Sequence, residues 1–166
     1  MASTETEQRV YDLLKKLEIP YKRHQHPPVY TVEQAKKHWS QVQGTHCKNL
    51  FLRNKKGNHH YLVILEAAKA ADLKALRRKL GEDGLSFASP KRLKKYLDLE
   101  PGAVSPFGLI HDQENQVKVV IDQDLKNAKI VNFHPNANTA TVGISFADFE
   151  KYLTWTENPV RYLPIS

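Results

Sequence analysis

The 166-residue sequence contains a single cysteine, Cys47, so an intramolecular disulfide is excluded. No apolar run approaches the length that a membrane-spanning helix needs. The N-terminal segment, MASTETEQRV, lacks the basic and then apolar pattern of a secretory signal peptide. These absences predict a cytoplasmic protein, with no membrane partner, that is stabilised by an apolar core and needs no disulfide.

Common signatures of catalysis are also missing. There is no GxxxxGK[ST] phosphate loop, no GxGxxG motif and no GxSxG nucleophile elbow. Eight histidines are present, but His24 and His26 have no Cys, Asp or Glu nearby at a recognised ligand spacing, and the adjacent His59 and His60 would point to opposite faces of a strand. Cys47 is expected to be a buried structural thiol. We therefore expect no metal and no cofactor.

Positive charge, by contrast, is in excess and unevenly placed. The formal net charge is +7, and residues 15–95 contain 19 Lys or Arg against 6 Asp or Glu. The rest of the chain is net negative. This asymmetry favours a polyanionic partner such as nucleic acid. The alternative, that the basic residues only solvate helix faces, stays open on charge alone.

Hydrophobic periodicity and turn residues predict a single α+β domain over residues 1–166. The expected helices cover residues 6–18, 31–39, 71–81, 89–99 and 145–155. The expected strands cover residues 21–26, 47–53, 59–65, 107–110, 117–122, 129–134 and 139–145. Cap residues support several helix ends, namely Thr31 with Gln34, Gly81, Ser89 with Pro90, and Ser145. The mixed order of elements predicts a curved, barrel-like mixed sheet flanked by helices.

Lys48 is an unusual residue within the predicted strand CKNLFLR. Strand alternation places Lys48, Leu50 and Leu52 on one face, and Cys47, Asn49, Phe51 and Arg53 on the other. A lysine that shares a face with two leucines either extends its ammonium group to water or is held in a pocket for a purpose. The sequence alone leaves both interpretations open.

Two loops could also carry chemistry. In PGAVSP, Gly102 and Pro106 bracket a tight loop that could present backbone N–H groups to an oxygen of a ligand, or could simply connect a helix to a strand. In NFHPNANTATVGIS, His134 is followed by Pro135, which favours an extended histidine at the end of a strand. An ordinary polar hairpin turn is the alternative.

Together the segments CKNLFLRNKKGNHHYLVIL, LSFASPKRLKKYLDLEPGAVSPFGLI and NFHPNANTATVGIS resemble the YbaK-like family of aminoacyl-tRNA editing domains. This family includes the editing insertion of bacterial prolyl-tRNA synthetase. The run KNLFLR with GAVSPFGL is most similar to the branch of free-standing alanyl-tRNA(Pro) deacylases, the ProX-like or PrdX-like proteins. The similarity spans roughly residues 20–155. Cys47 departs from the small residue expected there.

The resemblance implies hydrolysis of the ester between a mischarged amino acid and the terminal adenosine of tRNA(Pro), without metal. It implies catalytic roles for Lys48 and His134. It implies substrate binding by Asn49 and by the GxxxP loop, which consists of Gly102, Ala103, Val104, Ser105 and Pro106. Basic residues that could hold acceptor-stem phosphates are Arg53, Lys91, Arg92, Lys94 and Lys95. Aminoacyl-tRNA and prolyl-tRNA synthetase are the implied partners.

Alternative functions remain open at this level. The same scaffold could hydrolyse another mischarged tRNA such as Cys-tRNA(Pro). A non-catalytic tRNA-binding or other nucleic-acid-binding module would need the basic surface but not Lys48. The sequence leaves the oligomeric state and the role of the C-terminal tail, NPVRYLPIS, undetermined.

Overall fold

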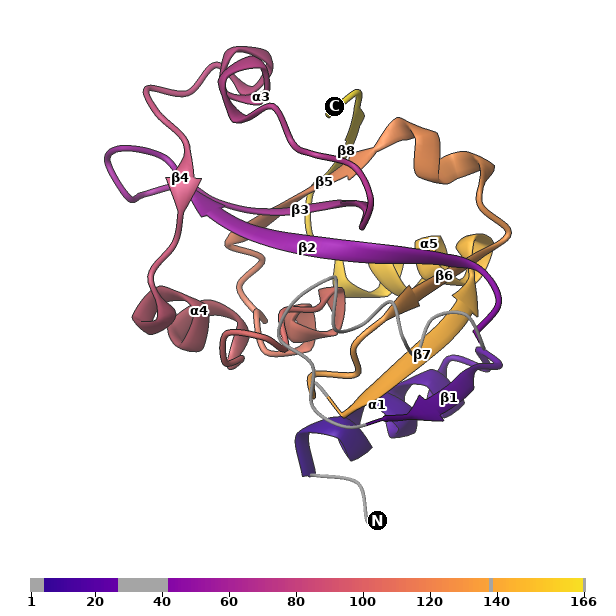
Figure 1. Cartoon of the computed structure of the whole chain (residues 1–166). Helices are drawn as coiled ribbons and strands as arrows, with labels where there is room; N and C mark the ends of the chain where they lie inside the picture. Colours follow the sequence, from indigo (N-terminus) through magenta and orange to yellow (C-terminus); the bar gives the residue numbers. More distant parts are fainter. Residues whose placement is uncertain (1–4, 27–41, 138, 166) are drawn as a thin grey trace.

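The structure, a computed structural model, describes residues 5–26, 42–137 and 139–165 (Figure 1). The helices are α1 (Glu5–Lys16), α3 (Leu73–Leu80), α4 (Pro90–Leu97) and α5 (Phe146–Thr156), with the 3₁₀ helices η1 (Pro106–Ile110) and η2 (Gln123–Asn127). The strands are β1 (Lys22–Gln25), β2 (Thr45–Arg53), β3 (His60–Glu66), β4 (Ser86–Phe87), β5 (Val117–Asp122), β6 (Ile130–Phe133), β7 (Ala140–Ser145) and β8 (Val160–Leu163). The predicted helix over residues 31–39, with its cap Thr31 and Gln34, lies outside the described residues.

The eight strands form one mixed sheet in the order β1-β7-β6-β2-β3-β5-β8, with β4 paired to β2. The pairs β2–β6, β3–β5 and β5–β8 are parallel, and the other pairs are antiparallel. Strand β2 is long enough to pair with β6 at its beginning and with β3 beyond it. The mixed sheet flanked by helices confirms the predicted fold class. Among the described residues, no ladder joins the edge strands β1 and β8.

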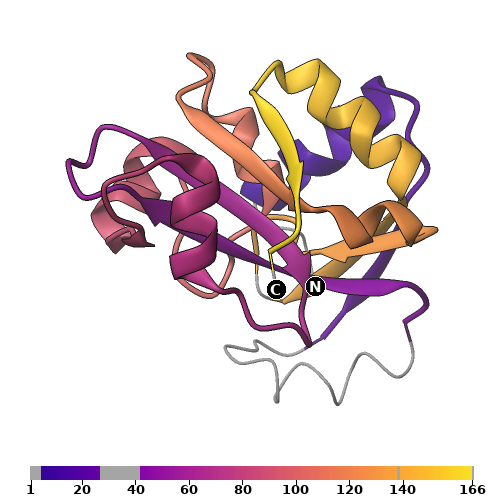
Figure 2. The same ribbon diagram turned by 90° about the horizontal axis from the view of Figure 1, so that it is seen from above.

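Apolar residues are buried on both faces of the sheet. The larger core cluster contains side chains of α1, α4, α5 and η1, together with Phe51 of β2. The smaller cluster lies on the other face, where Leu76 of α3 packs with Leu52 of β2. Figures 1 and 2 show α3 and α4 at one end of the molecule and α1 and α5 at the other. No helix in the described part of the chain has both the length and the apolar character required to cross a membrane.

The predicted helix caps that fall within the described residues are confirmed. Ser89 Oγ accepts a hydrogen bond from the backbone N–H of Arg92 at the start of α4, and Pro90 occupies the first turn. Ser145 Oγ caps α5 in the same way. Gly81 ends α3 in the left-handed conformation, with φ 69°, which glycine adopts at little cost.

The predicted strand over residues 107–110 is wrong, because this segment forms the 3₁₀ helix η1. A short apolar run fits a strand or a buried helical turn equally well from its pattern. Tertiary contacts favour the helix, since Ser105 Oγ accepts from the backbone N–H of Phe107 and the Tyr152 hydroxyl donates to the carbonyl oxygen of Pro106 at 2.8 Å. Sequence analysis also missed the short strands β4 and β8.

Gly108, within η1, is expected to tolerate no side chain. A Cβ there would lie 2.7 Å from Leu99 Cδ1 and 3.0 Å from Leu97 Cβ. We expect Gly108→Ala to lower the free energy of unfolding by about 1–3 kcal/mol, because the core must shift to accept it. Urea unfolding would measure this loss. The matched control is Gly84→Ala, whose Cβ would come no closer than 3.2 Å to its nearest neighbour, Lys55 Cβ, and an equal loss in both variants would contradict the packing argument.

Candidate active site

Strand pairing is interrupted along the edge of β2 that faces β6. Strand β6 pairs with β2 only at Thr45 and His46, and β4 pairs with the same edge only from Leu52 onward. The other edge of β2 is paired with β3 along residues 47–53. Residues 47–50 therefore have no strand partner on the first edge within the described chain. We call this stretch the β2 gap. It exposes backbone hydrogen-bonding groups at the centre of the sheet.

Lys48 and Asn49 lie in the middle of the β2 gap and project to opposite faces. The register places Lys48 opposite Leu65 and Asn49 opposite Ile64. Lys48 thus shares its face with Leu50 and Leu52, as strand alternation predicted. Its side chain is half-buried and makes no hydrogen bond or ion pair with any other described residue. This lysine is positioned against apolar surface and its ammonium group has no partner in that part of the chain.

Asn49 carries a buried acceptor without a donor. Its side-chain oxygen Oδ1 is inaccessible to solvent and accepts no hydrogen bond within the described ranges. Leaving such a group unsatisfied costs about 1–3 kcal/mol, so proteins rarely keep one without a reason. A ligand donor at this position would supply the missing partner.

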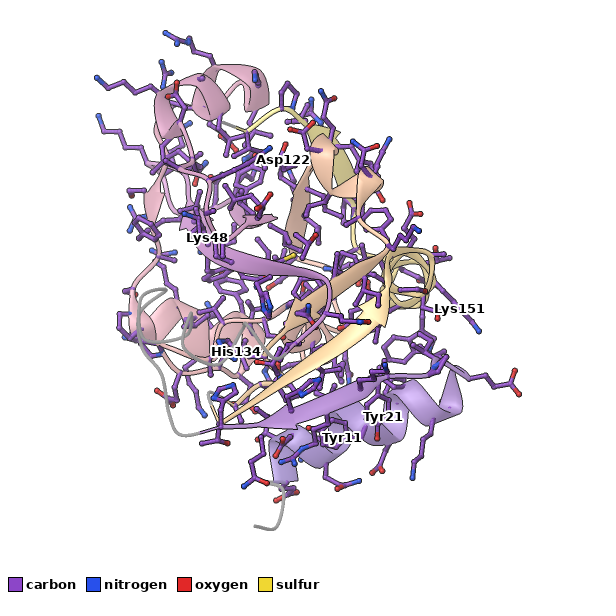
Figure 3. All side chains as sticks on the ribbon, turned by 45° about the vertical axis from the view of Figure 1, so that its right-hand side comes forward. Tyr11, Tyr21, Lys48, Asp122, His134 and Lys151 are labelled. Carbon is purple, nitrogen blue, oxygen red and sulfur yellow. The ribbon has the colours of Figure 1, made fainter. Side chains whose placement is uncertain are left out.

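His134 follows the last residue of β6. The parallel register pairs His46 with Asn132, and two steps further along each strand come Lys48 and His134. The ladder ends at this pair, but paired residues of parallel strands advance together and point to the same face, so extending the register predicts that His134 lies on the Lys48 side of the sheet, across the gap. Figure 3 shows Lys48 on β2 and His134 near the first residues of β7.

The imidazole of His134 is neutral near pH 7. Burial lowers its pKa, the hydrogen bond to Ala140 acts in the opposite direction, and the nearby His26 lowers it further. His134 Nδ1 lies 3.2 Å from the carbonyl oxygen of Ala140, to which it donates. The other nitrogen, Nε2, is then an acceptor, which could orient a water molecule or a hydroxyl group.

Two further polar residues adjoin His134, and sequence analysis did not assign them to a site. His26 and His134 have ring centroids 6.3 Å apart, and His26 Nε2 lies 3.0 Å from Thr141 Oγ1. His26 was considered only as a metal ligand from its sequence. Its proximity to His134 depends on the pairing of β1 with β7, which no local motif reveals.

The predicted GxxxP loop, residues 102–106, is anchored at both ends. Gly102 has φ 91°, a backbone conformation that favours glycine, and the N–H of Ala103 donates to the carbonyl oxygen of Glu100. At the other end, Ser105 and Pro106 are buried. The backbone amides of Val104 and Ser105 find no acceptor in the described ranges. Ser105 is fully buried, and a role of these amides as donors to a ligand oxygen stays a prediction.

The loop lies against the end of β6. The ring of Phe107, which follows the loop, packs edge-on against Phe133 with centroids 6.1 Å apart. Val104 packs against the larger core cluster, on the face to which Asn49 also points. Since Phe133 precedes His134, the loop and the histidine meet at the same end of the strand. The contact between Phe107 and Phe133 places the GxxxP loop near the end of β6, and the grouping of this loop and His134 with Lys48 in one site stays a prediction.

Cys47, the neighbour of Lys48, is expected to be unreactive. Burial raises the pKa of its thiol to about 12, and Sγ donates weakly to the carbonyl oxygen of Thr45. A thiol that stays protonated is a poor nucleophile. This agrees with the structural role expected from the sequence. No group of three or more His, Cys, Asp or Glu side chains in the described ranges is arranged to hold a metal ion.

The basic residues of α4 differ in their availability. Lys91 and Lys95 are exposed, and Lys95 Nζ lies 5.2 Å from the centroid of the Tyr96 ring. Lys94 is neutralised by Asp98 at 2.9 Å, with Glu100 at 3.6 Å. Of these lysines, Lys91 and Lys95 are the better placed to meet a phosphate.

The two arginines of the predicted tRNA-binding set also have structural roles. Arg92 Nη1 donates to the carbonyl oxygen of Gly57 at 3.0 Å and lies 3.1 Å from His60 Nε2. Burial, with the nearby charges of Arg92, Arg53, Lys95 and His59, lowers the pKa of His60 to about 4, so this imidazole accepts from Arg92. Arg53 donates to the carbonyl oxygens of Asn54 and Lys55. Both arginines hold the β2–β3 hairpin in place.

Comparisons with known proteins agree on one family. The family model described as the aminoacyl-tRNA editing domain matches residues 26–152. The chain is 42% identical to the prolyl-tRNA editing protein ProX of Acetoanaerobium sticklandii, covering 97% of this chain and 98% of that protein. It is 33% identical to the prolyl-tRNA synthetase associated domain-containing protein 1 of Danio rerio, covering 95% and 86%. A crystal structure of a candidate trans-editing enzyme for prolyl tRNA synthetase shares the fold, with TM-score 0.73, 20% identity and coverage of 99% and 100%.

Proposed function

Since this chain belongs to the aminoacyl-tRNA editing domain family, we propose that it is a trans-editing hydrolase that deacylates mischarged Ala-tRNA(Pro). The observation that supports the proposal is the β2 gap, where Lys48 and Asn49 are paired with β3 on one edge and have no strand partner on the other within the described chain. The similarity to the prolyl-tRNA editing protein ProX over nearly the full chain supports tRNA(Pro) as the carrier.

An editing enzyme of this kind compensates for the limited selectivity of a synthetase for its amino acid. A synthetase pocket rejects a smaller amino acid weakly, because one or a few missing methylene groups change binding by only about 1–3 kcal/mol each. Prolyl-tRNA synthetase can therefore charge alanine in error. A second site that accepts alanyl ester and excludes the bulkier prolyl ester removes the wrong product.

Each site residue has a role that its geometry supports. The Lys48 ammonium, free of protein partners in the described chain, would hold the terminal adenosine or polarise the ester carbonyl. Asn49, whose side-chain oxygen has no donor in the described chain, would help to bind the alanyl moiety from the opposite face of β2. The amides of Val104 and Ser105 would donate to a substrate oxygen.

The proposed chemistry needs no covalent intermediate with the protein. Water adds to the ester carbonyl carbon, the bond from that carbon to the ribose oxygen breaks, and the proton lost by water passes to the departing ribose oxygen. Alanine and a free terminal hydroxyl result. A vicinal ribose hydroxyl of the adenosine, with the neutral His134 Nε2 as acceptor, would orient the water. The site contributes positioning and charge stabilisation.

The proposed function implies partners and a location in the cell for this protein. The tRNA(Pro) acceptor end would meet Lys91 and Lys95, with Arg53, Arg92 and Lys94 adding to the local positive field. Affinity would then fall as salt concentration rises. Prolyl-tRNA synthetase is a proposed second partner, and the cytoplasm is the proposed location, because newly charged tRNA is present there.

Single-turnover deacylation tests the proposal directly. Ala-tRNA(Pro) is expected to lose its amino acid rapidly, while Pro-tRNA(Pro) is spared and Cys-tRNA(Pro) and Ser-tRNA(Pro) define the size limit. Preference for the cysteinyl ester would keep the mechanism and change the substrate. Salt-sensitive tRNA binding with no hydrolysis of any of the four would contradict the enzyme and leave a binding module.

A further inference from the structure

Phe87 is unusually exposed for a phenylalanine. Its side chain is 64% exposed, and Trp155 is the only other large apolar residue that is exposed in the described part of the chain. Phe87 lies in the segment LSFASP, where nothing in the sequence distinguishes it from a core residue. Single exposed apolar side chains are common on protein surfaces, so the position of Phe87 in the sheet, more than its exposure, is what requires an explanation.

The strand that carries Phe87 borders the β2 gap. β4 pairs with β2 so that Phe87 is directly opposite Leu52. Directly opposed residues of antiparallel strands share a face, so Phe87 lies on the face of Lys48, Leu50 and Leu52. Leu52 is four positions after Lys48 in β2, which corresponds to about 13 Å along the strand. Figure 1 shows β4 beside β2, between α3 and α4.

Basic residues outnumber acidic residues around Phe87. Arg53 pairs with Ser86 across β2 and β4, Lys55 lies beside Gly84, and the exposed Lys91 begins α4 shortly after Phe87. The nearby acids are engaged by other groups. Glu82 accepts hydrogen bonds from Tyr61 and Asn54 and pairs with His59, whereas Asp83 accepts from the backbone N–H of Lys55. An aromatic ring in a basic setting suits nucleic acid.

We infer that Phe87 is a stacking platform for one of the unpaired nucleotides that precede the terminal adenosine of tRNA. Single-stranded RNA ends are bound by stacking bases on aromatic rings within basic grooves. A stacked nucleotide advances about 3.4 Å, so about four stacked steps, or fewer where the strand is extended, cover the roughly 13 Å from Lys48 to Leu52, opposite which Phe87 lies. This inference rests on the proposed function, because an adenosine bound at the β2 gap would determine which nucleotide of the tRNA end reaches Phe87.

The test compares two substrates in the full-length protein. One is Ala-tRNA(Pro), and the other is the alanyl ester of adenosine, which lacks the preceding nucleotides. We expect Phe87→Ala to lower the ratio of kcat/KM for the tRNA to kcat/KM for the short ester by about 5- to 150-fold. Phe87→Trp should restore the ratio and Phe87→Leu should not, because stacking needs an aromatic face. Trp155→Ala removes the other exposed aromatic, on α5 at the far end of the sheet, and should leave the ratio unchanged (Figure 1).

The outcomes separate this inference from the proposed function. An unchanged ratio, or an equal fall for both substrates, overturns the stacking platform while leaving deacylation intact. A loss seen only when prolyl-tRNA synthetase is added overturns it in favour of a protein contact. If the wild-type protein hydrolyses neither ester, the proposed function fails, and the binding of uncharged tRNA to the wild-type and Phe87→Ala proteins still tests the platform. Equal affinities there would overturn it.

Discussion

Replacing Lys48 by alanine is expected to slow single-turnover deacylation of Ala-tRNA(Pro) by about 10²–10³-fold, while tRNA binding is largely retained. The half-buried ammonium group has no protein partner in the described chain, so its electrostatic effect is available to the substrate. Removing one preorganised donor from a low-dielectric site costs about 2.7–4 kcal/mol of transition-state stabilisation. Because many phosphate contacts hold tRNA, losing one lysine changes affinity far less.

Two variants distinguish catalysis from structure at this position. Lys48→Met keeps the apolar stem against Leu50 and Leu52 and removes only the charge, so it should be as inactive as Lys48→Ala but at least as stable as wild type. Lys151→Ala removes an equal charge from exposed α5, which Figure 3 shows on the other side of the molecule, and should retain full activity. Full activity in Lys48→Met would mean that the lysine merely extends to water.

His134→Ala is expected to reduce the single-turnover rate by about 10²-fold or more, at the lower end of what a positioned acid–base group contributes. The variant removes the Nε2 acceptor beside the β2 gap and the hydrogen bond to Ala140. His111→Ala is the matched control, because His111 is an exposed histidine at the end of η1. Comparable losses in both variants would refute a specific role for His134.

The pH profile supplies a second readout for His134. Burial holds its pKa below the ordinary value of 6.5, so the neutral form persists when the pH is lowered to 6.5 and is lost only below it. The rate should therefore remain high through pH 6.5 and fall as the imidazole is protonated at lower pH. This low-pH limb should be absent from the residual activity of His134→Ala. A wild-type midpoint above 6.5 would contradict a buried, neutral histidine.

Most helices and strands could be predicted from local pattern. The caps at Ser89 and Ser145 and the stop at Gly81 are confirmed, because a cap satisfies its own helix end and depends on a few adjacent residues. Residues 107–110 were mispredicted because an apolar run of that length carries no period of its own. Their helical form comes from Tyr152, far along the chain.

Some features of the candidate site could likewise be predicted from local sequence, and others could not. Alternation along CKNLFLR placed Lys48 with the leucines, and the register with β3 confirms it. The β2 gap was not predictable, since it arises where β6 ends its pairing and β4 begins. Nor could sequence show that Arg92 is committed to Gly57 and His60, because charge counts do not distinguish a free guanidinium from a bonded one.

Local chemistry thus established the fold class, the family resemblance and the residues able to do chemistry, since caps, alternation and motif spacing act over a few positions. The arrangement of those residues depends on strand order, which brings together positions distant in sequence. Pairing of β2 with β6 brings the strand that precedes His134 to the start of the β2 gap, and pairing with β4 sets an exposed Phe87 on the Lys48 face. Exposure and partnership are properties of the packed chain, because they depend on which distant atoms exclude water from each group.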